Sequence, residues 1–349
     1  MAHISIIIPV YNAGMKIKSC LRSIRKQTFQ DYEVLIVDDG STDKSGQICD
    51  QFAAGDSRLK VIHQKNQGSI AARRTGLHYA AGEYCCFCDA DDRMLADALE
   101  VLHRSIKDAD ICIGNSVRLW RNVRIKNSYT ALCFQTNQPV FYNQQAFTEN
   151  MLCSWFGISN VPVGLCGKLF RTDLLRKAYD KTPDAVHFFG DDLVVTLNTS
   201  VLAKKTCFIP DIIYEYRIGG GTSKYNPHML EDWLALYRYK KTFIGLYPMK
   251  QNAQVLMDIE LCNMMMTYFR MLKQSQRFSE DELRRYINDT IQIPEVRSAA
   301  QNPDIPSGEY CNVTMLRDRE SERILAELES EFQRNKFKQT IHNMLRRLA

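Results

Sequence analysis

Residues 84–92 read "YCCFCDADD", a short apolar run that ends in three acids. A run of this length without apolar/polar alternation is typical of a strand buried on both faces of a sheet. Two carboxylates about 4 Å apart repel each other by about 4 kcal/mol at an effective dielectric constant near 20, so acids at the mouth of such a strand favour a cation. The same acids would also fit a solvated turn that caps the next helix. Local composition leaves both interpretations open.

The first 120 residues repeat this unit. Strand-like runs at residues 4–10, 32–37, 59–63, 84–88 and 110–114 alternate with segments whose apolar residues recur at helical spacing. These segments are marked by Ile17, Cys20, Leu21 and Ile24, by Ile48 and Phe52, and by Leu95, Leu99, Leu102 and Ile106. Alternation of strand and helix predicts an α/β fold with a mostly parallel central sheet flanked by helices.

Polar clusters follow these strands, at the sheet edge where α/β proteins bind ligands. The first strand ends in "PVYN" (9–12), the second in "DDGSTD" (38–43) and the fourth in "DADD" (89–92). The stretch "NQGSIAARR" (66–74) adds a glycine turn before a helix with two early arginines, which favours phosphate. Taken singly, residues 38–43 also suit an Asx turn, and the arginines suit a solvated basic face.

Composition limits the class of protein. The chain has 349 residues, 45% of them hydrophobic and 24% charged, with a net charge of +5, which predicts a globular protein with no nucleic-acid partner. The apolar start is too short for a membrane span and lacks a basic leader, so we expect a cytoplasmic protein. Twelve scattered cysteines are expected to be reduced core residues, without zinc spacing.

Four segments together resemble the family 2 glycosyltransferases of the GT-A fold. They are "ISIIIPVYN" (4–12), "YEVLIVDDGSTD" (32–43), "NQGSIAARRTGL" (66–77) and "GEYCCFCDADD" (82–92). The resemblance implies an inverting transferase of the bacterial cell-surface polysaccharide type. It also implies a GT-A catalytic domain over residues 1–227, with a nucleotide-sugar half at 1–115 and an acceptor half at 116–227. A helical region would follow at 228–349, with a loop at 294–306.

The resemblance implies roles at the sheet edge. Tyr11 would stack on a uracil ring, and the Asp39 carboxylate would accept a hydrogen bond from the base N–H. Asp91 would bind Mg²⁺ or Mn²⁺, and Asp89 would contact the ribose or the metal. The implied nucleotide-sugar site comprises Pro9, Tyr11, Asn12, Asp39, Gly40, Arg73, Asp89, Ala90, Arg217 and Ser223. Of these, Arg217 and Ser223 belong to "IYEYRIGGGTSKY" (213–225), which resembles a segment that closes over the diphosphate.

The remaining catalytic residues come from later segments. "FFGDDLVVTLN" (188–198) resembles the family's G-E-D segment, which implies Asp192 as the base for the acceptor hydroxyl, with Asp191 in place of the family's Glu. An acid pair that stabilises a helix N-terminus is the structural alternative. "GLCGKLFRTDLL" (164–175) resembles a segment on the acceptor side and implies a role there for Lys168; Trp155 is assigned to the same side.

The expected function is transfer of a hexose or N-acetylhexosamine from a UDP-sugar to a hydroxyl of a glycan or lipid-linked oligosaccharide, in lipopolysaccharide or capsule synthesis. A nucleotidyltransferase is disfavoured because no basic glycine-rich loop follows the first strand. A dehydrogenase is disfavoured because no G-x-G-x-x-G is present there. A non-catalytic carbohydrate-binding protein would suit the aromatics of residues 120–160 but would not need the acids.

The end of the chain, residues 332–349, has five Lys or Arg and no acid, with Phe337, Ile341, Met344, Leu345 and Leu348 on one helical face. This pattern suits a peripheral contact with the anionic inner leaflet of a membrane, on its cytoplasmic side. It suits equally a helix that packs on its own domain or on a partner. A homo-oligomer also stays open at this stage.

Overall fold

The computed structural model describes residues 3–120, 123–125, 131–158, 160–183, 190–218, 225–306, 309–318 and 321–348, without the side chains of Trp120, Leu132, Asp191 and residues 335–348. The chain divides into two compact units. One comprises Met1–Gly220 with Gly245–Gln251, and the other Gly221–Ile244 with Asn252–Ala349. The expected catalytic domain limit at residue 227 stays a prediction.

The first unit begins with the predicted alternation of strands and helices. Its first elements are β1 (Ile4–Val10), α1 (Lys16–Arg25), β2 (Tyr32–Asp39), α2 (Ser45–Ala54), β3 (Leu59–Gln64), α3 (Ser69–Tyr79), β4 (Tyr84–Phe87), β5 (Arg93–Met94) and α4 (Ala98–Ile106). β1 pairs in parallel with β2 and β4, and β2 pairs in parallel with β3. This part of the prediction is confirmed.

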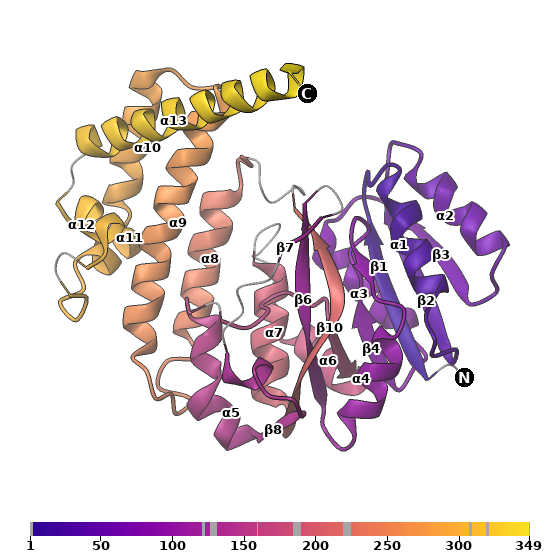
Figure 1. The fold of residues 1–349 in the computed structure, drawn as a ribbon. Helices are drawn as coiled ribbons and strands as arrows, with labels where there is room; N and C mark the ends of the chain where they lie inside the picture. The colour runs from indigo at the N-terminus through magenta and orange to yellow at the C-terminus, as the bar shows by residue number, and fades with distance from the viewer. Residues whose placement is uncertain are drawn as a thin grey trace. The chain divides into compact units, whose positions relative to one another are not determined.

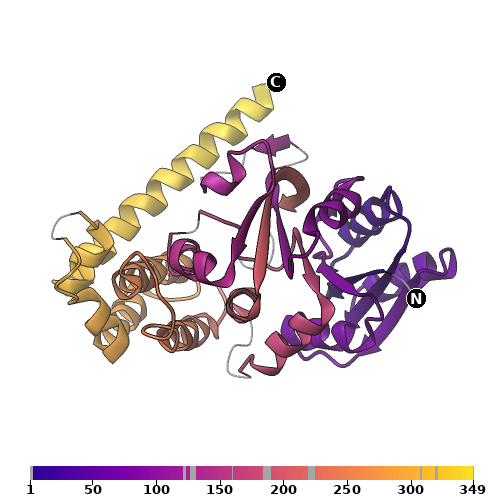
Figure 2. The same cartoon turned by 90° about the horizontal axis from the view of Figure 1, so that it is seen from below.

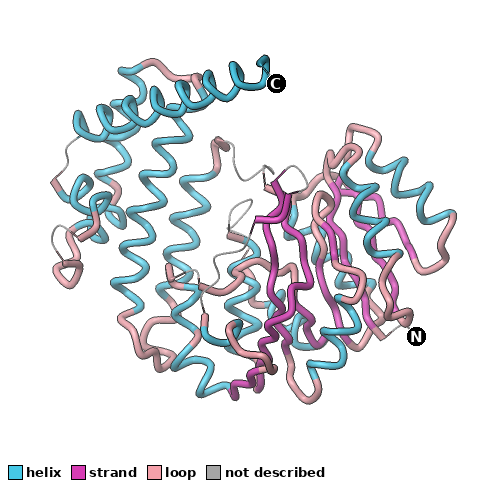
Figure 3. The backbone as a smooth tube through the Cα atoms, viewed as in Figure 1, coloured by secondary structure: helices cyan, strands magenta, loops and turns pink. Residues whose placement is uncertain are grey.

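The second part of this unit completes the same sheet. It contains β6 (Ile111–Trp120), β7 (Val123–Ile125), η1 (Leu132–Phe134), β8 (Val140–Asn143), α5 (Gln144–Asn150), η2 (Leu152–Trp155), β9 (Lys168–Arg171), α6 (Thr172–Asp180), α7 (Asp191–Leu202) and β10 (Lys205–Arg217). The strand order is β3-β2-β1-β4-β9-β6-β10-β5, with β7 beside β6 and β8 beside β10 (Figure 3). β9 runs antiparallel between β4 and β6, whereas β6 and β10 are parallel. Six strands (β1, β2, β3, β4, β6 and β10) run in one direction and β5, β7, β8 and β9 run against them, so the sheet is mixed with a parallel majority, as expected for the GT-A fold.

Helices cover both faces of this sheet (Figures 1 and 2). Alternate residues of β1 explain the two layers, because successive side chains of a strand point to opposite faces. Ile4, Ile6 and Ile8 lie in one core with the apolar stripes of α1 and α4. Ile7 faces α3, where a Cβ on Gly76 would come within 2.5 Å of the Ile7 side chain. Glycine at this position allows helix and sheet to approach closely.

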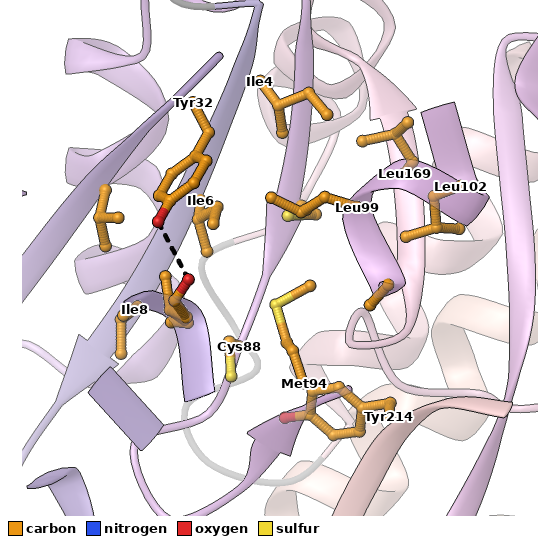
Figure 4. Close-up of a cluster of buried hydrophobic side chains, with 14 of the residues drawn as sticks. Ile4, Ile6, Ile8, Tyr32, Cys88, Met94, Leu99, Leu102, Leu169 and Tyr214 are labelled. Carbon is orange, nitrogen blue, oxygen red and sulfur yellow. Dashed lines mark hydrogen bonds between the residues drawn. The ribbon is translucent and has the colours of Figure 1, made fainter. Parts of the chain in front are cut away.

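Figure 4 shows the core on the α1 and α4 side. The Tyr32 hydroxyl, otherwise buried in apolar surroundings, donates a 3.0 Å hydrogen bond to the carbonyl of Ile24 at the end of α1. Cys86 and Cys88 contribute small buried side chains to the same cluster. All twelve cysteines belong to the described residues and are unpaired, and burial raises the pKa of the Cys85 thiol to about 12. Ten of the twelve are buried, as predicted for core residues, whereas Cys166 is half-buried and Cys311 is exposed.

The second unit is helical in its described part. Its helices are α8 (Met229–Lys241), α9 (Ala253–Ser275), α10 (Glu280–Gln292), α11 (Pro294–Ala300), α12 (Cys311–Arg317) and α13 (Ser321–Leu348). The loop expected over residues 294–306 was wrong for its first part, because Pro294 stands at the first turn of α11, where its missing N–H and fixed φ suit a helix; residues 301–306 are irregular, as expected. Among the described residues, no helix is both long and apolar enough to cross a membrane. The predicted apolar face of residues 332–349 lies almost entirely outside the described side chains.

Candidate active site

The ends of β1 and β2 are fastened together by Asn12. Its side-chain oxygen accepts hydrogen bonds from the backbone N–H groups of Thr42 (2.8 Å) and Asp43 (3.2 Å), and its own N–H donates to Ser41 Oγ (3.0 Å). Asn12 has φ +47°, a conformation that asparagine tolerates better than most residues. Pro9, in β1, lies opposite Val37 of the neighbouring strand β2. Tyr11, which follows β1, is 53% exposed. The exposed Tyr11 ring is therefore carried by a well-anchored loop.

Asp39, at the end of β2, holds the turn that precedes α3. Its carboxylate accepts hydrogen bonds from Gln64 Nε2 (2.8 Å) and from the backbone N–H groups of Gln67 (2.9 Å) and Gly68 (2.8 Å). A carboxylate has about four acceptor sites, so these bonds leave room for one more donor. Gly40 follows with φ +73°, and a Cβ there would lie 2.8 Å from the Asn66 nitrogen. The predicted uridine-site residues Pro9, Tyr11, Asn12, Asp39 and Gly40 thus come together at one edge.

An exposed histidine, His63, supports the same turn from the other side. Asp38 accepts the Ser41 N–H at 3.2 Å, and its second oxygen lies 2.9 Å from His63 Nδ1. Nε2 of that imidazole lies 3.1 Å from Asp50, and the two carboxylates raise the pKa of His63. His63 thus links the carboxylates of Asp38 and Asp50.

Tyr214 on β10 joins two of the acids that follow β4. Its hydroxyl accepts the Asp89 N–H (3.0 Å) and donates to Asp92 (2.9 Å), whose other oxygen accepts the Arg217 N–H (2.7 Å). Asp92 is 1% exposed. Burial, together with the nearby charge of Asp89, raises the pKa of Asp92 to about 8. Asp92 therefore supports the loop from beneath and leaves Asp89 and Asp91 to present the charge.

Asp89 and Asp91 fit a divalent cation that shares its coordination with a substrate. Their side chains are about 30% exposed, and Asp91 Oδ2 lies 3.2 Å from Lys16 Nζ. Within the described residues, no three His, Cys, Asp or Glu side chains converge as a preformed metal cage. Mg²⁺ and Mn²⁺ suit such an arrangement, since they are commonly held by one or two carboxylates, waters and substrate phosphates. Ala90, between the two acids, is buried.

Arg73 of α3 bridges the acid after β4 and the acid at the start of α7. Its Nη2 lies 2.9 Å from Asp89 Oδ1, and its Nη1 lies 2.9 Å from Asp192 Oδ1. Arg73 is 5% exposed. Asp191 and Asp192 begin α7 after Gly190, whose φ of +96° sets the turn. The sequence predicted Arg73 for the nucleotide and Asp192 for the acceptor, and the structure joins the two residues by an ion pair.

Asp89 and Asp192 open into one cavity of about 270 Å³. Its wall is formed by Asp89, Ser116, Arg118, Pro162, Val163, Gly164, Cys166, Asp192, Tyr214 and Tyr216. Ser116, Arg118, Tyr214 and Tyr216 were not singled out in the sequence. Their signal was the polar residue at every second position near the ends of β6 and β10, since alternate residues share one face of a sheet.

The residues assigned to the acceptor side lie in the interior. Lys168 is buried at the start of β9, and its ammonium donates to the carbonyls of Pro162 (2.8 Å) and Gly164. Burial lowers the pKa of Lys168 to about 8. Trp155 is buried against Phe147, at 5.3 Å between ring centroids, and does not line the cavity. Their assignment to the acceptor side stays a prediction: Lys168 supports the cavity wall through Pro162 and Gly164, and Trp155 is buried in the core.

Of the two residues predicted to contact the diphosphate, Arg217 and Ser223, only Arg217 belongs to the described residues. Arg217 reaches Asp92 through its backbone N–H, and its half-buried side chain is not part of the cavity wall. Ser223 and the glycines of residues 219–221 lie outside the described residues.

Comparison with known proteins agrees with this arrangement. The family model for glycosyl transferase family 2 matches residues 5–159. Glycosyltransferase GlyG of Streptococcus pneumoniae serotype 4 is 34% identical over 229 residues, which cover 63% of this chain and 72% of that protein. Residues 1–349 of S. aureus TarS, solved with UDP-GlcNAc, superpose with a TM-score of 0.64 at 20% identity, covering 95% of this chain and 92% of that one. Mannosyltransferase PcManGT from Pyrobaculum calidifontis, solved with GDP-Man and Mn²⁺, gives 0.52 at 16% identity, with coverage of 85% and 82%. The two solved structures share the fold of this chain.

Proposed function

This chain belongs to glycosyl transferase family 2, and from that premise we propose that it moves a hexose or N-acetylhexosamine from a UDP-sugar to a hydroxyl of a glycan or lipid-linked acceptor, with inversion. The observation that carries the proposal is the shared cavity of Asp89 and Asp192, bridged by Arg73. The single side chain of Arg73 bridges Asp89, at the donor edge, and Asp192, at the start of α7. Transfer requires the donor-binding group and the base to act on the same pair of substrates, so the two acids must lie close together.

The donor would lie along the edge formed by β1, β2 and β4. The exposed Tyr11 ring offers a stacking surface for uracil, and the Asp39 carboxylate retains an acceptor site for the base N–H. Asp91, with Asp89, would hold Mg²⁺ or Mn²⁺, which when bound neutralises charge on the diphosphate leaving group. A UDP-sugar donor is supported by the UDP-GlcNAc bound to TarS, and a divalent ion by the Mn²⁺ bound to PcManGT.

Asp192 would remove the proton from the acceptor hydroxyl as that oxygen attacks the anomeric carbon. Its place at the start of α7 suits a carboxylate, because a helix N-terminus carries partial positive charge. Arg73 fixes the orientation of this carboxylate through Oδ1, and Gly164 leaves space beside Oδ2, where a Cβ would come within 3.3 Å. The base is thereby held at the cavity wall, within reach of a hydroxyl in the cavity.

The cellular role proposed is synthesis of lipopolysaccharide or capsule at the cytoplasmic face of the inner membrane. The basic, acid-free composition of residues 332–349 supports contact with anionic lipid, where each Lys or Arg near the surface contributes roughly 1 kcal/mol. We assign catalysis to residues 1–227. Vesicle binding that persists after deletion of residues 332–349 would contradict the membrane contact.

The experiment is UDP release from a panel of UDP-sugars with Mn²⁺, Mg²⁺ or EDTA. We expect release with one or a few UDP-hexoses or UDP-N-acetylhexosamines, and loss of release in EDTA. Asp192→Asn should lower transfer by about 10²-fold to 10⁴-fold while UDP still binds, because only the proton acceptor is lost. Asp211→Asn, at an exposed position on β10, is the matched control. Full transfer by Asp192→Asn would remove Asp192 from the base role, and release in EDTA would remove the metal.

A further inference from the structure

One cation in the wall of the 270 Å³ cavity is not used by the mechanism above. Arg118 lies near the end of β6, beside Tyr216 of β10 in the parallel register. Ser116 and Tyr214 form the register pair two residues earlier, so these side chains share one face of the sheet. That face forms the cavity floor next to Asp89 and Asp192.

Three other arginines near this strand pair, Arg73, Arg93 and Arg124, have carboxylate partners. On the opposite face, Glu215 lies 2.9 Å from Arg93 and 2.8 Å from Arg124. Arg73 is paired with both Asp89 and Asp192. Across the part of the chain that the structure describes, no carboxylate lies within ion-pair distance of Arg118. Its guanidinium therefore faces the cavity with its donors available to a ligand.

Position along the sheet edge indicates which substrate Arg118 would meet. The uridine site proposed above lies at the ends of β1 and β2, and Asp89 follows β4. β6 lies two strands beyond β4, which is about 10 Å at the usual strand spacing. Arg118 therefore lies away from Asp89 and Asp91, where the metal and diphosphate are proposed to bind, in the cavity that also contains the proposed base Asp192. A group bound there belongs to the acceptor.

Resting on the proposed function, we infer that the acceptor carries a carboxylate or phosphate group near the receiving hydroxyl, and that Arg118 binds this group. Arginine presents paired N–H donors that match the oxygens of either anion. Tyr216 and Ser116 would flank the group with further polar contacts. The acceptor class is therefore an acidic sugar or a sugar phosphate, and Arg118 selects it over a neutral sugar.

Direct binding tests this assignment without turnover. The probes are two matched pairs, methyl β-glucuronide with methyl β-glucoside, and glucose 6-phosphate with glucose, titrated calorimetrically into protein saturated with UDP and Mn²⁺. We expect the charged member of at least one pair to bind about tenfold to a hundredfold more tightly, the range for a hydrogen bond to a charged group. The first pair reports a carboxylate acceptor and the second a phosphate acceptor.

Three variants locate the effect. Arg118→Gln should remove the preference for the charged probe, and Arg118→Lys should retain part of it. Arg104→Gln, which removes the same charge from an exposed site on α4, should behave as the wild type. Equal affinity within both pairs, no binding of any probe, or a preference that survives in Arg118→Gln would overturn the inference. Weaker UDP binding in Arg118→Gln would instead assign Arg118 to the donor.

These outcomes are separate from failure of the proposed function. If UDP does not bind with Mn²⁺, the donor site proposed at β1, β2 and β4 is wrong, and the acceptor inference falls with it. If UDP binds and the paired probes bind equally, the inference about Arg118 alone is wrong, and a neutral acceptor replaces the acidic one.

Discussion

Nη1 of Arg73 lies 2.9 Å from Oδ1 of Asp192, so a guanidinium on α3 holds the carboxylate at the start of α7. The same guanidinium contacts Asp89 through Nη2. Two acids separated by about a hundred residues in the chain are thus held by one buried cation. Their relative position does not depend on a ligand.

Replacing Arg73 with Met should lower transfer by about 10²-fold, because misplaced catalytic groups lose effective molarity. Asp89 and Asp192 are partly exposed, so the loss of unfolding free energy should be about 1–2 kcal/mol, below the ~3–5 kcal/mol of a fully buried pair. Arg73→Lys should be intermediate, since an ammonium cannot reproduce the planar fork. Urea unfolding and UDP-release kinetics measure the two effects. Wild-type rates in Arg73→Met would show that the bridge plays no part in catalysis.

Asp92 predicts a pH dependence of stability. Its pKa in the fold is about 8, above the ordinary 3.8. Between pH 3.8 and about pH 8, the Asp92 carboxyl keeps its proton only in the folded state. The unfolding free energy therefore falls as the pH rises through this range, and Asp92 adds no further change above it. Asp92→Asn should remove this loss, because its side chain does not ionise. The unfolding free energy of the variant minus that of the wild type should therefore be higher at pH 8.5 than at pH 5, by roughly 2 kcal/mol or more. Urea unfolding at both pH values tests it, and a difference that does not change with pH would contradict the buried, protonated carboxyl.

Lys16 competes with a metal ion for Asp91, because its ammonium lies 3.2 Å from Oδ2. Lys16→Met should tighten Mn²⁺ binding about twofold to fivefold, in keeping with the small free energy of an exposed ion pair. Mn²⁺ titration followed by electron paramagnetic resonance, with UDP present, measures the affinity. Lys18→Met, on the same helix, removes an equal charge without this contact and serves as the control. Weaker Mn²⁺ binding in Lys16→Met would place Lys16 among the groups that bind the diphosphate.

Lys168→Met should weaken acceptor binding, because Lys168 supports two residues of the cavity wall, Pro162 and Gly164. Loss of the ammonium leaves the carbonyls of Pro162 and Gly164 without their donor, which should cost about 1–3 kcal/mol of unfolding free energy. Because these residues line the cavity, KM for the acceptor should rise, while UDP affinity stays at the wild-type value. Steady-state kinetics with calorimetric UDP titration separates the two. A change in UDP affinity alone would show that Lys168 acts on the donor side.

The donor half of the fold followed from local pattern. Buried runs such as residues 4–10 and 84–87, each closed by polar residues, predicted strands whose ends meet at one edge, and Asn12, Asp39 and Asp89 lie there. The spacing of apolar residues and the polar residues that follow each strand are both properties of short stretches of sequence. Placement of Asp89 near Asp192 is long-range and came from the family resemblance.

The acceptor half was less predictable because its contacts are non-local. The antiparallel insertion of β9 between β4 and β6 depends on a pairing with β4 across more than eighty residues and one with β6 across more than fifty. A lysine is usually exposed, so Lys168 gave no sign of its burial, which two carbonyls of the chain itself make tolerable. Arg118 and Tyr216 looked like ordinary strand residues until the register of β6 and β10 set them side by side.

The hydrogen bonds of Asn12 and Asp39 have a thermodynamic consequence. Both side chains hold their turns through several backbone N–H groups of the chain itself. The conformational entropy of ordering these turns is therefore lost when the chain folds and not when the donor arrives. Such a donor edge would be preorganised for the proposed UDP-sugar, because the donor would meet turns that the chain's own hydrogen bonds already order.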